Sequence, residues 1–492
     1  MKLSEIRSLN QKIYELDTEI NRNSKTIFIA ALIFCLTQNK DFRNASKLST
    51  LVNFSDEEKK PIDQIIDIAK TGIKKLGLQA NTEKAIFDSL RIISGVNTNL
   101  DRDRKAFREF VEHFITNEYV SIKPDDLFLE TLYMEIDKKA GTGDDGVVLT
   151  PVFAAQLMID LAEIDYKKDV VADLCSGTGL FSLLSYSKML SDMNMDLKEK
   201  LITDVEYKKY QNKLYNSIIA NDNDSKMVTL CLANFLLKSL NHELILSEDV
   251  LSLQKSSFKV KKDGVDQRIQ PTKAILNPPY EDKYKPLEIL QKNIELISNS
   301  GVKNSKVVVI IPAQKFGLKR DVLSKILNIS TLESVIKMQD DLFADSGKSQ
   351  AASIFIFNAD KPHKKSDIVM YFDFTDTGYI YLKDSGLVDK NNIFEQKKQN
   401  FLERMSSREE LKSSFTRTWT NFYEVNRELA IKAQIDPTRV KSSKEEADIT
   451  MENITIKKML VEKEKLIADA NNNFRDEDGA FERYIVGILS EE

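Results

Sequence analysis

Apolar residues recur at helical spacing through roughly the first 140 positions of the chain. Residues 9–20, 60–78 and 105–120 place them three and four positions apart, with few β-branched alternations. This pattern predicts an N-terminal helical domain over residues 1–140. The longest apolar run, residues 26–36, is too short to span a bilayer and is typical of a buried helix.

The pattern changes after a glycine-rich acidic linker at 141–146, where short apolar runs begin to alternate with helical segments. The runs lie at 170–175, 217–222, 273–279, 306–312, 332–338, 351–357, 367–374 and 379–383. Such alternation predicts an α/β core with a mostly parallel sheet over residues 141–385. Beyond 385 the strand pattern stops, and lysine- and glutamate-rich segments predict a C-terminal helical region over 386–492.

Composition and charge narrow the possible partners. The 492 residues carry 71 Lys and Arg against 76 Asp and Glu, which gives a formal charge of -5. Contact with nucleic acid therefore needs a partner or a local basic face, such as the lysine-rich segment 254–273. The alternative for this segment is a solvated basic loop.

The scattered cysteines Cys35, Cys175 and Cys231 favour a reducing cytoplasm and argue against a disulfide framework or a zinc site. The three histidines have no partner at ligand spacing, so we expect them to be structural and expect no metal. The start of the chain shows no signal-peptide pattern, and we expect a cytoplasmic protein without a membrane segment.

Acidic residues end three successive predicted strands. Asp173 ends the first and precedes a turn with Gly177 and Gly179, where glycine lets the backbone approach a ligand closely. Asp222 ends the second, where an acid commonly binds ribose hydroxyls, although it also suits a helix N-cap. A further strand candidate at 243–251 carries Asp249 near its end, where it can accept from an adenine amine. Ser182 replaces the third glycine of a dinucleotide fingerprint, which excludes that motif.

The apolar run 273–276 ends in the rigid turn Asn277-Pro278-Pro279-Tyr280. Asn277 and the Pro278 carbonyl can both accept from one exocyclic amine, which draws the nitrogen lone pair out of conjugation. The two prolines fix the backbone in that geometry. Tyr280 can stack on the flat group that carries the amine. The alternative is a simple strand-to-loop turn.

DLCSGTG at 173–179 and NPPY at 277–280 resemble motifs I and IV of S-adenosylmethionine-dependent amino-methyltransferases that act on adenine in DNA. More narrowly, residues 125–385 resemble the modification subunit of type I restriction–modification systems. Val148 and Leu149 depart from the aromatic residues usual before Thr-Pro, and Asp222 replaces the more frequent glutamate. The resemblance implies a Rossmann-like fold and catalysis by Asn277, Pro278, Pro279 and Tyr280. It implies S-adenosylmethionine as cofactor, bound by Leu149, Thr150, Pro151, Asp173, Cys175, Ser176, Gly177, Thr178, Gly179, Asp222 and Asp249.

The implied reaction is transfer of a methyl group to the N6 amine of a flipped adenine in DNA. The sequence shows no helicase motif, no P-loop and no base-reading module. We therefore expect a specificity subunit, docked on the C-terminal region at 444–470, and a restriction subunit as partners. The alternative for residues 444–470 is packing on the N-terminal helical region of the same chain. The same core chemistry leaves open cytosine N4, a base in RNA or a protein glutamine as target. An α/β scaffold without catalysis is the non-enzymatic alternative.

Overall fold

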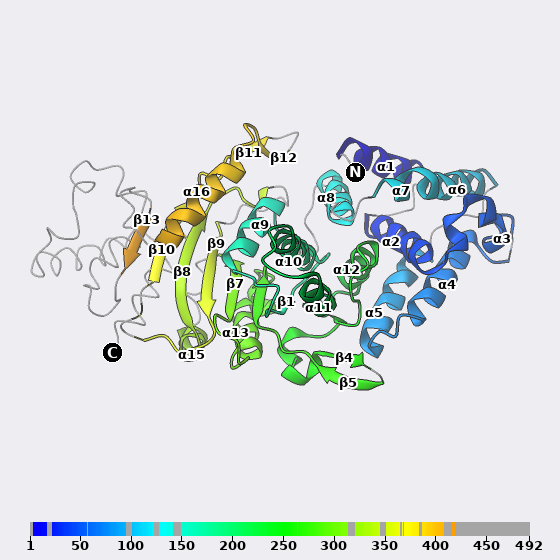
Figure 1. Cartoon of the computed structure of the whole chain (residues 1–492). Helices are drawn as coiled ribbons and strands as arrows, with labels where there is room; N and C mark the ends of the chain where they lie inside the picture. Colours follow the sequence, from blue (N-terminus) through cyan, green and yellow to red (C-terminus); the bar gives the residue numbers. More distant parts are fainter. Residues whose placement is uncertain are drawn as a thin grey trace, which may run out of the picture. The chain divides into compact units, whose positions relative to one another are not determined.

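The structure is a computed structural model in which the chain divides into two compact units (Figure 1). The first contains residues 1–144 and 164–270, and the second contains residues 145–163 and 271–492. The described residues are 3–16, 22–56, 58–94, 101–122, 127–140, 149–262, 264–312, 320–344, 351–364, 367, 369–382, 386–407 and 416–419. The sequence-based boundaries at 140 and 385 stay a prediction.

Up to residue 140, the described elements of the first unit are all helical, which agrees with the sequence pattern. The helices are α1 (Leu3–Leu16), α2 (Arg22–Gln38), α3 (Leu48–Leu51), α4 (Pro61–Lys74), α5 (Ala80–Leu90), α6 (Asp101–His113), α7 (Tyr119–Ser121) and α8 (Phe128–Ala140). The apolar run 26–36 lies in α2 and is buried along its whole length, as predicted.

The same unit holds three short parallel strands, β1 (Val171–Asp173), β2 (Ile218–Asn221) and β3 (Ile245–Leu246), in the order β1–β2–β3. All of their residues are buried, as expected of parallel strands covered on both faces. The helices that follow β1 and β2 are α10 (Leu180–Lys198), α11 (Asp204–Leu214) and α12 (Ser225–Leu237). Helix α12 packs on α2 and α5, so it lies between the N-terminal helices and these strands, and α5 also contacts β3 (Figure 1).

The basic segment 254–273 forms an exposed antiparallel hairpin of β4 (Lys259–Lys262) and β5 (Val265–Arg268). One cross-strand ion pair joins Lys259 Nζ to Asp266 Oδ2 at 2.6 Å. The side chain of Val265 is 69% exposed. The hairpin is therefore a surface feature, held to the unit through Phe258 and Val260, which are buried.

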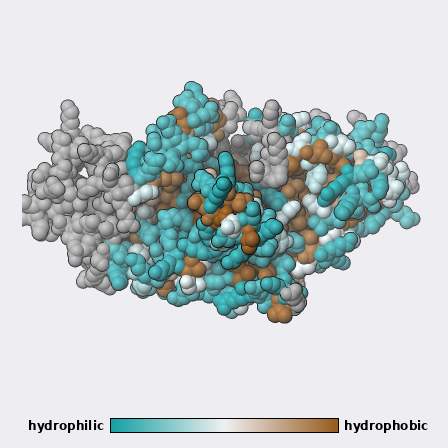
Figure 2. Space-filling view, in the orientation of Figure 1, coloured by the Kyte–Doolittle hydropathy of each residue, from teal (hydrophilic) through white to brown (hydrophobic). Residues whose placement is uncertain are grey.

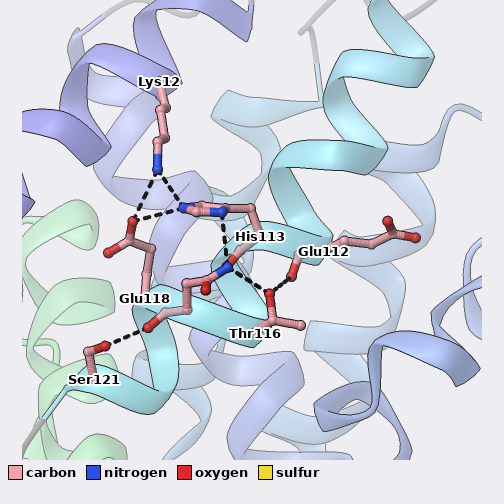
Figure 3. Close-up of polar contacts among 7 residues, drawn as sticks. Lys12, Glu112, His113, Thr116, Glu118 and Ser121 are labelled. Atoms are coloured by element: carbon pink, nitrogen blue, oxygen red, sulfur yellow. Dashed lines mark hydrogen bonds and ion pairs between the residues drawn. The ribbon is translucent and has the colours of Figure 1, made fainter.

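A polar cluster joins α1 to the end of α6, where a π-helical turn spans Phe114–Glu118 (Figure 3). His113 Nε2 lies 3.1 Å from Glu118 Oε1, and Lys12 Nζ lies 3.5 Å from the same oxygen. Asn117 Nδ2 lies 3.0 Å from His113 Nδ1. The ring of His113 is thus held from both nitrogens, which accords with the structural role expected for it.

The second unit is built on a sheet with the order β13-β10-β8-β9-β7-β6. Pairs β6/β7 and β8/β10 are parallel, while β9 runs antiparallel between β7 and β8. The strands are β6 (Lys273–Leu276), β7 (Lys306–Ile311), β8 (Thr331–Met338), β9 (Ser353–Asn358), β10 (Val369–Phe374) and β13 (Thr416–Trp419). The helices are α9 (Val152–Leu161), α13 (Pro286–Ile297), α15 (Arg320–Ile329) and α16 (Phe394–Ser407). Strand β13 pairs antiparallel with β10. With the parallel pairs of β1 to β3 included, the strands confirm the predicted mostly parallel α/β core.

The structure differs from the sequence pattern at the C-terminal side. The last predicted strand is β11 (Tyr379–Leu382), which leaves the main sheet and pairs with β12 (Gly386–Asp389) in a two-stranded sheet. Strands β12 and β13 lie beyond residue 385, where helix alone was predicted, so that expectation is wrong at these positions. The predicted docking segment 444–470 lies outside the described residues.

Most of the visible surface is hydrophilic, with a patch of apolar residues in the region of α10 and α11 (Figure 2). Met195, Leu201 and Val205 are the exposed large apolar side chains there. Every helix among the described residues is too short or too polar to cross a membrane.

The aromatic core of the helical region provides a test of this packing. Phe28 is 1% exposed, and its ring centroid lies 5.4 Å from that of Phe107 and 5.7 Å from that of Phe110. We expect Phe28→Ala to lower the free energy of unfolding by about 3–5 kcal/mol, because a cavity remains. Urea unfolding followed by circular dichroism measures it. Val205→Ala, at a side chain 79% exposed, is the control, and an equal loss in both variants would contradict the described packing.

Candidate functional site

The turn after β1 connects Asp173 to the start of α10 in the first unit. Gly177 and Gly179 have φ angles of 53° and 93°, which strain any residue with a side chain. A Cβ on Gly179 would lie 3.0 Å from Cys231 Sγ, whereas one on Gly177 would meet no atom within 4 Å. Gly179 is therefore required for packing against α12, and Gly177 borders open space, where its backbone is accessible to a ligand.

Asp222 holds this turn in place from the end of β2. Its Oδ2 accepts a hydrogen bond from Gly177 N at 2.9 Å, and its Oδ1 accepts one from Asp224 N at 2.9 Å. The N-cap of α12 is Asp224, whose Oδ1 accepts from Lys226 N at 2.7 Å. The N-cap role considered for Asp222 thus belongs to Asp224. Burial raises the pKa of Asp222 to about 6, so this carboxylate is ionised at neutral pH and keeps acceptor capacity for a ligand hydroxyl.

Asp249 is exposed and caps the short 3₁₀ turn Val250–Ser252, where its Oδ1 accepts from Leu251 N at 3.0 Å. The end of β3 is joined to β2 by Asn221, which the sequence reasoning did not single out. Asn221 Nδ2 donates to the carbonyl oxygens of Leu174 at 3.2 Å and Glu248 at 3.1 Å.

A second residue that sequence reasoning missed is Glu130 on α8. It is 1% exposed, and its Oε2 accepts a hydrogen bond from the Thr178 hydroxyl in the glycine turn. Its Oε1 has no hydrogen-bond partner within the described chain, and the same holds for Oδ1 of the fully buried Asp173. The sequence signal that could have pointed to Glu130 is an acidic residue within a mostly apolar helical segment.

Burial determines the protonation of this pair of acids. It raises the pKa of Asp173 to about 8, and burial together with the nearby Asp173 charge raises the pKa of Glu130 to about 8. Ser182 N and Oγ donate to Asp173 Oδ2 at 3.3 and 3.1 Å, which favours the ionised form but does not offset burial. Burial also raises the pKa of the Cys175 thiol, so it is no thiolate nucleophile.

In the second unit, β6 ends at Leu276 and runs into the predicted Asn-Pro-Pro-Tyr turn. Asn277 is half-buried, and its Nδ2 donates to Thr150 Oγ1 at 2.9 Å. Thr150 is 5% exposed, and Pro151 after it is the N-cap residue of α9.

Tyr280 is 4% exposed, with its ring edge-on to Phe343 at 5.6 Å between centroids. Its hydroxyl has no hydrogen-bond partner among the described residues, and burial raises its pKa well above the usual range. The stacking role predicted for this ring therefore requires it to become exposed.

The described contacts bring together two groups of predicted site residues, one within each unit. Asp173, Gly177 and Asp222 meet around the glycine turn, while Thr150 meets Asn277. Ser176 N in the same turn donates to the carbonyl of Asn221 at 2.9 Å, and Leu149 is half-buried. The described His, Cys, Asp and Glu side chains form no cluster that could hold a metal ion.

Comparison with known proteins identifies the family. The family described as N-6 DNA methylase matches residues 130–443, well over half of the chain. The chain belongs to the N-6 DNA methylase family. A curated relative of this methylase is the type II restriction enzyme and methyltransferase RM.BcgI from Heyndrickxia coagulans. The two are 27% identical over 310 residues, which are 60% of this chain and 44% of the relative. The methylase thus spans less than half the length of that relative.

Solved structures share the fold of this methylase. The methyltransferase subunit of a type I restriction–modification system from Streptococcus thermophilus has a TM-score of 0.52 at 13% identity, with 85% of this chain and 96% of that chain covered. A chain from a structure on complex assembly and conformational transition of the type I R-M system has a TM-score of 0.55 at 15% identity. The match covers 96% and 98% of the two chains.

The raised pKa of Glu130 leads to a pH-dependent stability prediction. The folded methylase holds this proton up to about pH 8, whereas the unfolded chain loses it near 4.3, so the free energy of unfolding falls as the pH rises through that window. Glutamine has no proton to lose. The free energy of unfolding of Glu130→Gln relative to wild type should therefore rise by about 1 kcal/mol per pH unit between pH 6 and 8.

Urea unfolding at pH 6, 7 and 8 measures this slope. Glu109→Gln, at a side chain 65% exposed, is the matched control and should show no such trend. A pH-independent difference between Glu130→Gln and wild type would show that Glu130 is ionised in the folded methylase.

Proposed function

We propose that this methylase transfers a methyl group from S-adenosylmethionine to the exocyclic N6 amine of adenine in DNA. The observation that carries the proposal is the rigid turn from Asn277 to Tyr280 at the end of the buried strand β6. Asn277 Oδ1 and the Pro278 carbonyl are the acceptors for the target amine, and Tyr280 supplies an aromatic face for the base. In duplex DNA the base must first leave the stack, which costs a few kcal/mol.

The first unit fits a role in binding S-adenosylmethionine, which when bound supplies a methyl group on a cationic sulfur. Gly177 borders open space, so an added side chain would occupy the volume that a ligand needs. Asp222 is ionised at neutral pH and has lone pairs left for the ribose hydroxyls. Asp249 supplies an acceptor for the adenine amine of the cofactor.

Nucleic acid is the substrate class that the surface favours over a protein glutamine. The β4–β5 hairpin presents Lys259, Lys261 and Lys262 on an exposed ladder, which suits phosphate contacts. DNA rather than RNA follows from the family match. Because structures of type I restriction–modification subunits share the fold, we propose that a specificity subunit selects the site, with a restriction subunit as further partner. The cytoplasm is then the place of action.

We expect Asn277→Ala to lower the methyl-transfer rate by about 100-fold or more, because one preorganised acceptor of the target amine is lost. Its affinity for S-adenosylmethionine should stay within about twofold of wild type. Transfer of tritiated methyl groups to DNA measures the rate, and calorimetry measures the affinity. Asn358→Ala, a half-buried asparagine on β9 of the same unit, is the control. Near-normal turnover of Asn277→Ala would refute the assignment of the turn.

Asp222→Ala should instead weaken S-adenosylmethionine binding by about 10- to 100-fold, since charge-assisted hydrogen bonds to the ribose are worth about 1.5–3 kcal/mol. Asp224→Ala is the matched control two residues away, because it removes the cap of α12 but leaves Asp222 in place. Equal affinities of the two variants, with folding verified, would mean that the cofactor is bound elsewhere.

A further inference from the structure

The side-chain amide of Asn277 has two ends with opposite hydrogen-bonding character. The oxygen accepts and the nitrogen donates, and rotation by 180° about the Cβ–Cγ bond exchanges them. This terminal torsion is broad and roughly two-fold, so the side chain does not select one orientation by itself. Pro278 and Pro279 fix the backbone but leave this torsion free. A target amine needs the oxygen, because the nitrogen end would present a donor to a donor.

Thr150 is the partner that the structure gives to the nitrogen end. Its Oγ1 lies 2.9 Å from Asn277 Nδ2, and this nitrogen donates the hydrogen bond. With the nitrogen directed at Thr150, the oxygen points to the other side of the amide. Thr150 is 5% exposed, so the contact is largely shielded from competing water.

Thr150 is itself held in place through α9, which begins two residues later. The Phe153 ring stacks on Tyr379 at 3.9 Å and meets Phe394 edge-on at 5.3 Å. Near the other end of α9, Lys398 Nζ lies 3.0 Å from Asp160 Oδ2. All of these residues belong to the second unit, as does Asn277. The hydroxyl that receives the amide is therefore mounted on a helix anchored to the same unit.

We propose that Thr150 is a positioning residue for methyl transfer, which holds the Asn277 amide with its oxygen turned toward the target amine. This inference rests on the proposed function of the Asn277 turn. It differs from the cofactor role that the family resemblance implies for Thr150, because it assigns the Thr150 hydroxyl to the Asn277 amide. The two roles predict different kinetic changes.

Thr150→Val keeps the shape of the side chain and removes its acceptor. In the full chain, assembled with the subunits that support DNA methylation, we expect the transfer rate at saturating DNA and S-adenosylmethionine to fall about 3- to 10-fold, the effect of one neutral hydrogen bond. The affinity for S-adenosylmethionine, measured by calorimetry without DNA, should stay within about twofold. Thr150→Ser restores the hydroxyl and should recover the rate to within about twofold of wild type.

Thr331→Val is the matched control, because Thr331 is buried in the same unit and donates to the Lys361 carbonyl at 3.1 Å. It should leave the rate unchanged. An unchanged rate in Thr150→Val, or a loss that Thr150→Ser does not recover, would overturn the inference. A weaker cofactor affinity with an unchanged saturated rate would overturn it in favour of a cofactor contact. Absence of transfer by the wild-type assembly would instead overturn the proposed function.

Discussion

The buried amide of Asn221 is the constraint on which the first unit's site depends. It is 1% exposed, so its donors and acceptor must be satisfied inside the protein. Its nitrogen donates to the carbonyls of Leu174 and Glu248, and its oxygen accepts from Glu248 N at 3.1 Å. One side chain on β2 thereby ties together the segments that leave β1 and β3. Asp173 ends β1 and Asp222 directly follows Asn221 on β2, so this amide links the segments that carry the two acids.

Burial then determines which of the acids near these strand ends are ionised. Asp222 has a pKa of about 6 and is ionised at neutral pH, while Asp173 and Glu130 have pKa values of about 8 and retain protons. Three full charges at this turn would repel one another in a poorly solvated environment. The one ionised carboxylate is the one that accepts from the Gly177 backbone, so the charge lies beside the open side of the turn.

The strands and the two turns could be predicted from the local sequence pattern, because each of them depends on residues that are adjacent in the chain. The apolar runs became β1, β2 and β6 to β10, and a glycine turn and a double proline have few alternative conformations. Contacts between residues that are far apart in the sequence could not be predicted from local patterns. Glu130 meets Thr178 across 48 positions, and Thr150 meets Asn277 across 127. Strands β12 and β13 were missed for a related reason, since four-residue edge strands are defined by their partners rather than by their own pattern.

The path of the chain explains why so distant a residue reaches Asn277. Residues 145–163 belong to the second unit although the segments on both sides of them belong to the first. Side-chain contacts hold residues 149–163 to the second unit. Phe153 and Asp160 bind α9 to β11 and α16, and Glu163 receives Lys306 from β7 at 2.8 Å and Asn304 at 2.9 Å. Because α9 is held at both ends, little further conformational entropy is lost when Thr150 forms its hydrogen bond with the Asn277 amide. The double proline removes backbone freedom at the turn, and the anchors of α9 keep the Thr150 hydroxyl 2.9 Å from the Asn277 amide nitrogen.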